Sequence, residues 1–174
     1  MPSILFHGEE HPLLGTPPEV GQEMPEFTLI GGRARDPNLL DREEVASWRK
    51  PVLLSVVTSV DTPVGSLQAK VFEKRLADAP LADRVAGILV TSDLPFTINR
   101  FCRAEDIDHL VGGSDYLGRS FGRNWGLLLA GHEILARAVF VVDAEGRIRY
   151  REIVPEITSE PNYAASLEIL FGLV

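Results

Sequence analysis

The sequence predicts an α/β fold in which a mixed central sheet is flanked by helices. Three observations lead to this prediction. Two apolar runs, "KPVLLSVV" at 50–57 and "RVAGILVTSD" at 84–93, are typical of strands covered on both faces. Each run is followed by a segment with helical spacing or a helix start signal. The C-terminal part then has the pattern of a strand hairpin followed by one more helix.

The N-terminal extension, residues 1–32, is rich in proline and glycine. It contains two short strand candidates, "SILFHG" at 3–8 and "FTLIGG" at 27–32. We expect the extension to pack on a single domain that spans residues 1–174, because this length demands no second domain. The next segment, "NLLDREEVASW" at 38–48, is a predicted short helix.

A longer helix is predicted to begin near Val64. Leu67, Val71 and Phe72 follow helical spacing, and polar residues such as Gln68 and Glu73 lie between them. Further along the chain, two more segments have helical character. They are "LPFTINRFCRAE" at 94–105, with a proline near its first turn, and "LGRSFGRNWG" at 117–126.

The C-terminal part completes the pattern. "ARAVFVVDAEGRIRYREIV" at 136–154 is predicted to be a hairpin that turns at 144–146. "SEPNYAASLEILFGL" at 159–173 is predicted to be an amphipathic closing helix with a Ser and Pro start signal. This order of strands and helices is that of a thioredoxin-like core with an N-terminal extension.

Charge, hydropathy and cysteine content exclude several classes of protein. The net charge of −8 argues against nucleic acid as a partner, because nucleic-acid affinity depends on clustered Lys and Arg. The sequence contains neither a bilayer-length apolar run nor a signal peptide, so we expect no membrane contact and a cytoplasmic location. The only cysteine, Cys102, can form no disulfide within its own chain and excludes a cysteine-cluster metal site.

No sequence motif for a metal, a phosphate group or a hydrolytic serine is present, and we expect no cofactor. The histidines lack zinc-motif spacing, and His7 and His11 are expected to be exposed. The glycines of "LVGGSD" at 110–115 fit neither a Walker loop nor a dinucleotide fingerprint, and they are predicted to form a turn. The G-x-S-x-G elbow of serine hydrolases is also missing.

The stretch "TSVDTPVGSLQ" at 58–68 is the strongest candidate for a site. A strand that turns sharply into a helix presents the first N–H groups of the helix at the edge of the sheet, where they attract a negative group. In a thioredoxin-like core this place carries the reactive thiolate. The alternative is that Thr62 and Pro63 only cap and start the helix.

Four segments, in order, resemble the thiol peroxidase branch of the peroxiredoxin family, atypical 2-Cys type, and the likeness covers nearly the full chain. They are "SVDTPVG" at 59–65, "TSDLPFTINRFC" at 91–102, "ARAVFVVD" at 136–143 and "EITSEPNYAASLEIL" at 156–170. The resemblance implies reduction of hydroperoxides with electrons from thioredoxin. It also implies no metal or organic cofactor, and a homodimer.

The resemblance also assigns four site positions. Thr62 matches the threonine of the family motif, Arg137 matches the arginine that pairs with thiolate and peroxide, and Cys102 matches the resolving cysteine. The chain departs from the family twice, because Gly65 stands at the peroxidatic cysteine and Thr58 at the motif proline. Peroxide reduction needs a thiolate that attacks the O–O bond, and glycine supplies none. We therefore expect peroxidase activity to be lost or greatly reduced.

Two other functions stay open. One is a pseudoenzyme that binds a partner or a small anion at Thr62 and Arg137; the other is a one-cysteine redox protein that uses Cys102. For Arg137 we expect an anion, ordered water or a neighbouring carboxylate near its guanidinium, and the alternative is a surface arginine without a role. For Cys102 the alternatives are a remnant resolving thiol, a small buried apolar residue or a redox sensor.

Overall fold

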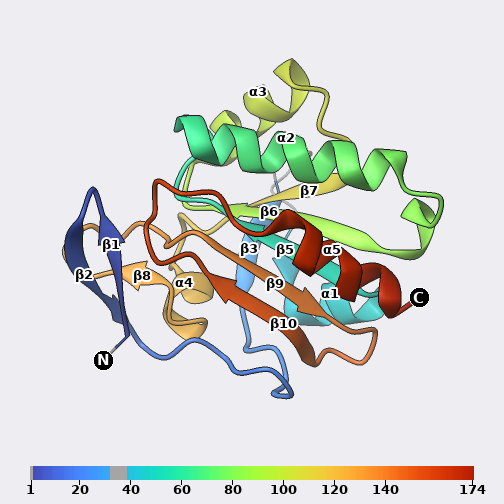
Figure 1. The fold of residues 1–174 in the computed structure, drawn as a ribbon, viewed down its shortest axis with the longest axis horizontal. Coiled ribbons are helices and arrows are strands. Elements are labelled where there is room, and N and C mark those ends of the chain that lie inside the picture. Colours follow the sequence, from blue (N-terminus) through green and yellow to red (C-terminus); the bar gives the residue numbers. More distant parts are fainter. Residues whose placement is uncertain (1, 32–38) are drawn as a thin grey trace.

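A seven-stranded mixed sheet forms the centre of the molecule (Figure 1). The computed structural model describes residues 2–31 and 39–174. The strand order is β10-β9-β5-β6-β7-β3-β4. These strands are β3 (Thr28–Gly31), β4 (Leu39–Asp41), β5 (Val52–Val56), β6 (Ala86–Thr91), β7 (Leu110–Ser114), β9 (Ala138–Val142) and β10 (Ile148–Ile153).

The middle of the sheet is parallel and its flanks are antiparallel. β5 pairs in parallel with β6, and β6 with β7, whereas β9, β10, β3 and β4 join in antiparallel pairs. Every residue of β5 is buried, which explains why its sequence is apolar without alternation. The predicted α/β fold with a mixed sheet is therefore confirmed.

Helices cover both faces of the sheet and create two apolar cores. Leu53 and Val139 point toward α2, α3 and α5 on one face, and their neighbours Leu54 and Phe140 point toward α1 and α4 on the other. This alternation follows from the period of two along a strand. The helices are α1 (Arg42–Ser47), α2 (Pro63–Asp78), α3 (Pro95–Ala104), α4 (Ser120–Asn124) and α5 (Tyr163–Gly172), with a 3₁₀ turn η1 (Ala82–Arg84) after α2.

The segment predicted as a helix at 38–48 is only partly helical. Residue 38 lies outside the described residues, and Leu39–Asp41 form the edge strand β4, which pairs with β3. The helix begins after Asp41, whose carboxylate accepts a hydrogen bond of 2.8 Å from the backbone N–H of Glu44. The N-cap at Asp41 therefore sets the boundary that the apolar pattern did not show.

The glycines of "LVGGSD" lie in a strand, so the prediction of a turn at 110–115 was wrong. Gly112 and Gly113 belong to β7. This strand is buried between α3 on one side of the sheet and the apolar core that contains Leu29 on the other. A Cβ atom on Gly112 would lie 2.5 Å from Cγ2 of Ile98, and one on Gly113 would lie 2.8 Å from Cδ1 of Leu29. These glycines allow close packing against the strand; they do not bend the chain.

The N-terminal part forms a second, three-stranded sheet. β1 (Ser3–Phe6) was predicted, whereas β2 (Glu9–Leu14) was not, and β2 pairs further with β8 (Leu128–Leu129). The hairpin is fastened to the C-terminal part of the chain. The N–H of Leu5 donates to Pro155 at 2.7 Å, and the N–H of Ile157 donates to Leu5 at 2.9 Å. Phe6 therefore comes to lie near the segment 155–158.

Helix α2 buries polar side chains that the sequence pattern placed on an exposed face. Gln68 and Glu73 are buried, whereas Leu67 is 40% exposed. The carboxylate of Glu73 accepts the backbone N–H groups of His109 at 2.6 Å and of Leu110 at 3.2 Å, and also that of Asp108. A buried carboxylate is tolerated where backbone donors satisfy it, so Glu73 anchors the start of β7 to α2.

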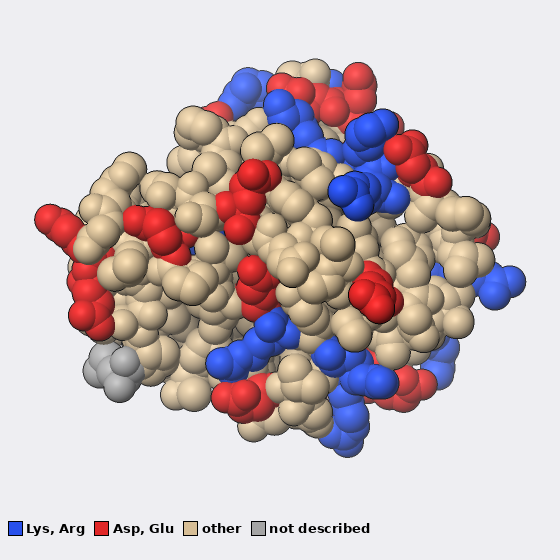
Figure 2. Space-filling model, in the orientation of Figure 1, with Lys and Arg blue, Asp and Glu red and all other residues tan. Residues whose placement is uncertain are grey.

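Charged side chains of both signs are interspersed on the face shown in Figure 2. In that view the described residues form no continuous basic band, which agrees with the net charge of −8. Within the described ranges no helix has both the length and the apolar character needed to cross a bilayer.

Candidate functional site

The chain between β5 and α2, residues 57–62, forms a tight corner that ends in a helix cap. Thr62 is the N-cap of α2, and its Oγ1 accepts a hydrogen bond of 3.1 Å from the backbone N–H of Gly65. The same hydroxyl donates to the carbonyl oxygen of Ser59 at 2.7 Å. The hydroxyl proton of Thr62 is thus already used inside the corner. Thr62 therefore caps α2, and Pro63 is the first residue of the helix.

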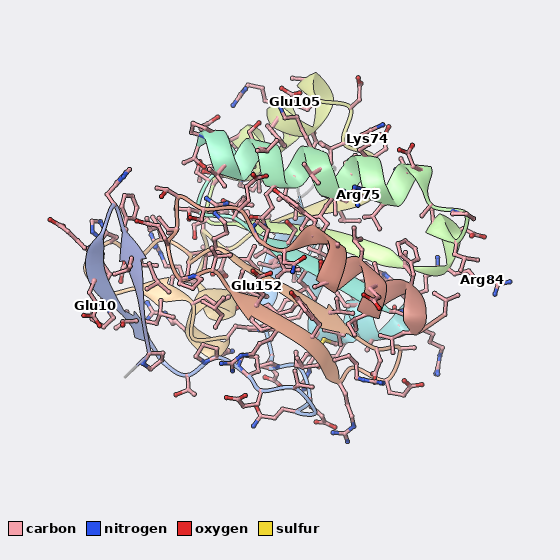
Figure 3. All side chains as sticks on the ribbon, in the orientation of Figure 1. Glu10, Lys74, Arg75, Arg84, Glu105 and Glu152 are labelled. Carbon is pink, nitrogen blue, oxygen red and sulfur yellow. The ribbon has the colours of Figure 1, made fainter. Side chains whose placement is uncertain are left out.

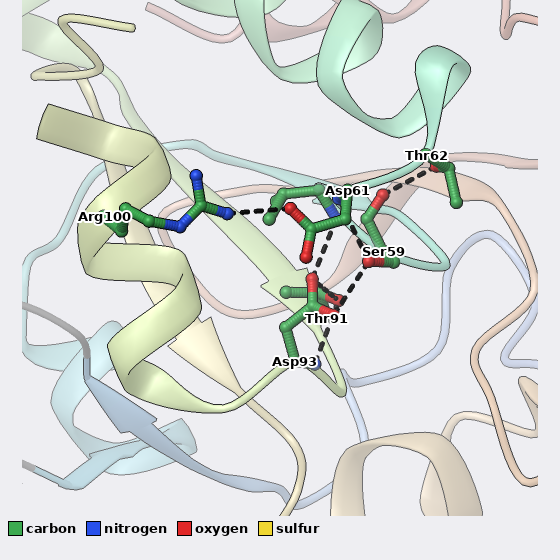
Figure 4. Close-up of polar contacts among 7 residues, drawn as sticks. Ser59, Asp61, Thr62, Thr91, Asp93 and Arg100 are labelled. Atoms are coloured by element: carbon green, nitrogen blue, oxygen red, sulfur yellow. Dashed lines mark hydrogen bonds and ion pairs between the residues drawn. The ribbon is translucent and has the colours of Figure 1, made fainter. Parts of the chain in front are cut away.

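Asp93, which follows β6, holds the corner in place (Figure 4). Its Oδ1 accepts from the hydroxyl of Ser59 at 2.8 Å, and its Oδ2 accepts from the N–H of Val60 at 2.8 Å. The hydroxyl of Thr91 also donates to Oδ2, at 3.0 Å. One carboxylate therefore fixes the Ser59–Val60 peptide from two sides, which is a strong arrangement because hydrogen bonds to a charged acceptor are short and strong.

Gly65 lies where the corner folds back against the first turn of α2. A Cβ atom built on Gly65 would lie 2.0 Å from the carbonyl oxygen of Ser59 and 2.6 Å from Oγ1 of Thr62. A backbone oxygen at 2.0 Å cannot be displaced by a simple rotamer change. The corner itself therefore occupies the space that a side chain at residue 65 would need.

Thr58 joins the corner to the segment that carries Arg137. Its Oγ1 donates to the carbonyl oxygen of Leu135 at 2.9 Å, two residues before Arg137. A proline at position 58 has no hydroxyl group and could not make this bond.

Arg137 is buried, with 2% of its surface exposed, and it lies just before β9. Its Nε donates to the carbonyl oxygen of Ile157 at 2.7 Å, and its Nη1 donates to Oε1 of Gln68 at 3.1 Å. Both acceptors are neutral, and Arg137 forms an ion pair with none of the described carboxylates. Burial lowers the pKa of the guanidinium below its usual value, because a desolvated charge is disfavoured.

A pocket of about 260 Å³ lies between the corner, Arg137 and the N-terminal hairpin. We call it the Arg137 pocket. Its apolar wall is formed by Phe6, Pro63, Val64 and Ile157. Its polar groups are Arg137, His7 and the hydroxyls of Thr58, Thr62 and Thr158.

A larger hollow, of about 360 Å³, lies elsewhere between α2 and residues 105–109, and charges of both signs line it.

The structure brings three of the four predicted site residues together. Thr62 and Arg137 line the same pocket, and Gly65 adjoins it through its hydrogen bond to Thr62. Cys102 lies on α3, half-buried against the apolar core that α2 and α5 share, and it does not line the pocket. The alternative of a surface arginine was wrong, because Arg137 is buried. The expected neighbouring carboxylate is missing among the described residues.

Sequence reasoning missed several residues of the site. Gln68 was assigned to an exposed face, although it lies one helical turn after Gly65 and so on the same side of α2. Asp93 gave no signal, because its partners come from another strand end. His7 is exposed as predicted, but it lines the pocket beside Phe6 through the pairing of β1 with residues 155–157.

Comparisons with known proteins agree with this architecture. The Redoxin family model matches residues 19–167. A thiol peroxidase of Mycobacterium tuberculosis is 37% identical over 98% of this chain and 99% of its own length. A thiol peroxidase of Streptococcus parasanguinis is 38% identical over 94% of each chain. The crystal structure of a peroxiredoxin-like protein from Aquifex aeolicus superposes with a TM-score of 0.86 at 30% identity, covering 99% of this chain and 97% of that one.

These matches extend over nearly the whole chain, and they include both the corner and the strand that follows Arg137. The thioredoxin-like fold predicted from the order of the elements is confirmed. The chain therefore belongs to the Redoxin family, as a peroxiredoxin-like protein whose relatives are thiol peroxidases.

Proposed function

We propose that this chain is a thiol-peroxidase-like protein that has lost peroxidase turnover and keeps its site for binding a small anion. In this proposal Gly65 stands at the position of the peroxidatic cysteine. The two-cysteine cycle needs one sulfur to attack the peroxide and a second to resolve the sulfenic acid. The chain has a single cysteine, Cys102, so it cannot complete that cycle alone.

The corner geometry supports loss of turnover in a second way. The space beside Cα of Gly65 is filled by the carbonyl oxygen of Ser59. The hydroxyl proton of Thr62 is engaged with that same oxygen. Thr62 therefore stabilises the closed corner, and a peroxide would have to compete for that proton.

The buried charge of Arg137 is the main support for the binding part of the proposal. Its buried guanidinium lines the Arg137 pocket and lacks an anionic partner among the described residues. A buried charge of this kind is costly unless an opposite charge accompanies it. A bound anion would compensate the charge without any thiol chemistry.

The unaltered protein is expected to reduce hydrogen peroxide and cumene hydroperoxide no faster than a blank without protein, because no thiolate lies in the pocket. The assay follows NADPH oxidation with thioredoxin and thioredoxin reductase, the electron source that the family implies. A Cys102→Ser variant serves as the control. Turnover by the unaltered protein that disappears in Cys102→Ser would replace this proposal with one-cysteine redox chemistry.

A homodimer also belongs to the proposal. Phe96, at the start of α3, is 82% exposed, Leu94 beside it is 49% exposed, and Leu117 is 61% exposed. The hydroxyl of Ser114 donates to the carbonyl oxygen of Asp93, which places the segment after β7 next to the start of α3. Such a group of exposed apolar side chains beside the corner suits a contact with a second copy.

The expected cytoplasmic location stays a prediction.

Phe96→Glu is expected to weaken self-association at least about tenfold, because it places a charge in an apolar contact. Sedimentation velocity over a range of protein concentrations measures the effect. Leu81→Glu is the matched control, since Leu81 is also exposed, at 38%, but lies beyond the other end of α2. A monomeric unaltered protein, or equal effects of the two substitutions, would contradict a dimer formed through this surface.

A further inference from the structure

We infer that the Arg137 pocket binds a small monocarboxylate with an apolar body, such as an aromatic carboxylate. The inference rests on the proposed function and names the class of ligand for that site. It depends on three properties of the pocket: the unused donors of its arginine, its single fixed charge and its apolar wall.

The guanidinium of Arg137 has donors left for a ligand. Of its five N–H groups, one on Nε and one on Nη1 are used by Ile157 and Gln68. No described residue accepts from Nη2. The two occupied donors hold the guanidinium in place, and Arg137 lines the pocket with three N–H groups that none of the described residues accepts. A carboxylate suits such donors because it can accept two parallel hydrogen bonds.

The charge of the pocket favours a monoanion. Arg137 is the only lysine or arginine among the lining residues that the structure describes. Arginine stays protonated in proteins at neutral pH, so the pocket keeps one positive charge. A neutral ligand would leave that charge uncompensated, and a doubly charged phosphate would bring a second negative charge against an apolar wall.

The apolar wall favours a ligand with a hydrocarbon part. Phe6, Val64 and Ile157 come from the N-terminal hairpin, α2 and the segment before α5, and they face a space of about 260 Å³. Acetate or chloride would leave most of this wall in contact with water. Burying a ring there adds affinity, because it removes apolar surface of both the ligand and the wall from water. The hydroxyls of Thr58 and Thr158 are further polar contacts near the wall.

The test is isothermal titration calorimetry with benzoate as the probe. Benzyl alcohol, acetate and inorganic phosphate serve as comparison ligands. Benzyl alcohol lacks the negative charge, acetate lacks the apolar body, and phosphate lacks both the carboxylate and the apolar body. Benzoate is expected to bind at least about tenfold more tightly than any of them. Equal binding of benzoate and benzyl alcohol would overturn the role of charge, and tighter binding of phosphate would overturn the monocarboxylate class.

Two variants and one control locate the site. Arg137→Met is expected to weaken benzoate binding at least about tenfold, by removing the charge with a side chain of similar length. Val64→Trp tests the pocket without touching the buried arginine, and it is expected to have a similar effect by filling the space. Arg84→Met is the control, because Arg84 is exposed and lies at the end of the molecule opposite the N-terminal hairpin (Figure 3). Benzoate affinity that survives Val64→Trp in a folded protein would overturn the inference.

The peroxidase assay keeps the two proposals separable. Benzoate binding without turnover supports both of them. No benzoate binding together with no turnover overturns only the monocarboxylate site. Turnover that benzoate inhibits overturns the loss of activity and retains the site, whereas turnover that benzoate does not affect overturns both.

Discussion

Gly65→Ala is expected to lower the free energy of unfolding by roughly 1–3 kcal/mol, the usual cost of forcing an extra carbon into a packed site. The new Cβ atom would lie 2.0 Å from the carbonyl oxygen of Ser59, so the corner or the first turn of α2 must move. The expected change in the free energy of unfolding is opposite in sign to the usual effect of a glycine-to-alanine substitution in a helix, since alanine normally stabilises a helix relative to glycine. Urea unfolding followed by circular dichroism measures the change.

Gly172→Ala is the matched control for this substitution. Gly172 also lies in a helix, at the end of α5, and a Cβ atom there meets nothing within 4 Å. It should leave the stability unchanged or raise it by up to about 1 kcal/mol. Equal effects of Gly65→Ala and Gly172→Ala would contradict a closed corner.

The closed space beside Gly65 also affects an attempt to restore the thiol by substitution. Gly65→Cys combined with Thr58→Pro is expected to stay without peroxidase turnover. The sulfur would have to displace the Ser59 peptide, and the proline would lose the hydrogen bond from Thr58 to Leu135. The thioredoxin-coupled assay checks this variant beside the unaltered protein. Rapid turnover would show that the corner opens at little cost.

Asp93→Ala is expected to lower the free energy of unfolding by roughly 2–4 kcal/mol. The substitution removes the acceptor for Ser59, Val60 and Thr91 together. A hydrogen bond to a charged acceptor contributes about 1.5–3 kcal/mol net, and the three bonds are not additive because they share one carboxylate and water can reach the vacated donors. Urea unfolding measures the loss.

Asp61→Ala is the control for this substitution. Asp61 pairs with Arg100 at 2.8 Å, but both side chains are 62% exposed, so the free energy of unfolding is expected to fall by only about 0.5 kcal/mol.

A double-mutant cycle then tests whether Asp93 keeps the space beside Gly65 closed. Without Asp93 the Ser59–Val60 peptide loses its fixed position, so Gly65→Ala should cost less in the Asp93→Ala background. We expect a coupling of about 1 kcal/mol, within the range found for residues that share partners. Strict additivity of the two substitutions would mean that Asp93 stabilises the fold without holding this peptide.

Much of the fold could be predicted because each central element carries its own local signal. β5 and β6 are continuous apolar runs, and the Thr62–Pro63 pair marks the start of α2. The errors arose where tertiary packing overrides local preference. Gly112 pairs with Leu89 in the sheet, and Ile98 fills the space that a side chain at residue 112 would need. Gln68 is buried because Arg137 and Ser55 satisfy its amide group.

The candidate site was predictable only in part, for a similar reason. Thr62 and Arg137 could be named from the family resemblance, since they belong to recognisable segments. Asp93, Phe6 and His7 could not, because their place in the site depends on which strand ends and hairpins meet in space. The closed space beside Gly65 is also invisible in the sequence, since it depends on the direction of one carbonyl group.

The tie between Leu5 and residues 155–157 has a consequence for how the protein is made. These contacts join two segments that are about 150 positions apart along the chain. During synthesis on the ribosome, the hairpin of β1 and β2 therefore lacks these neighbours until residues 155–157 have emerged. Contacts of such long sequence separation also form late in refolding, since a large loop has to close first. The Arg137 pocket needs both Phe6 and Ile157, so it is complete only after these segments have met, and a ligand of the pocket cannot guide the earlier steps of folding.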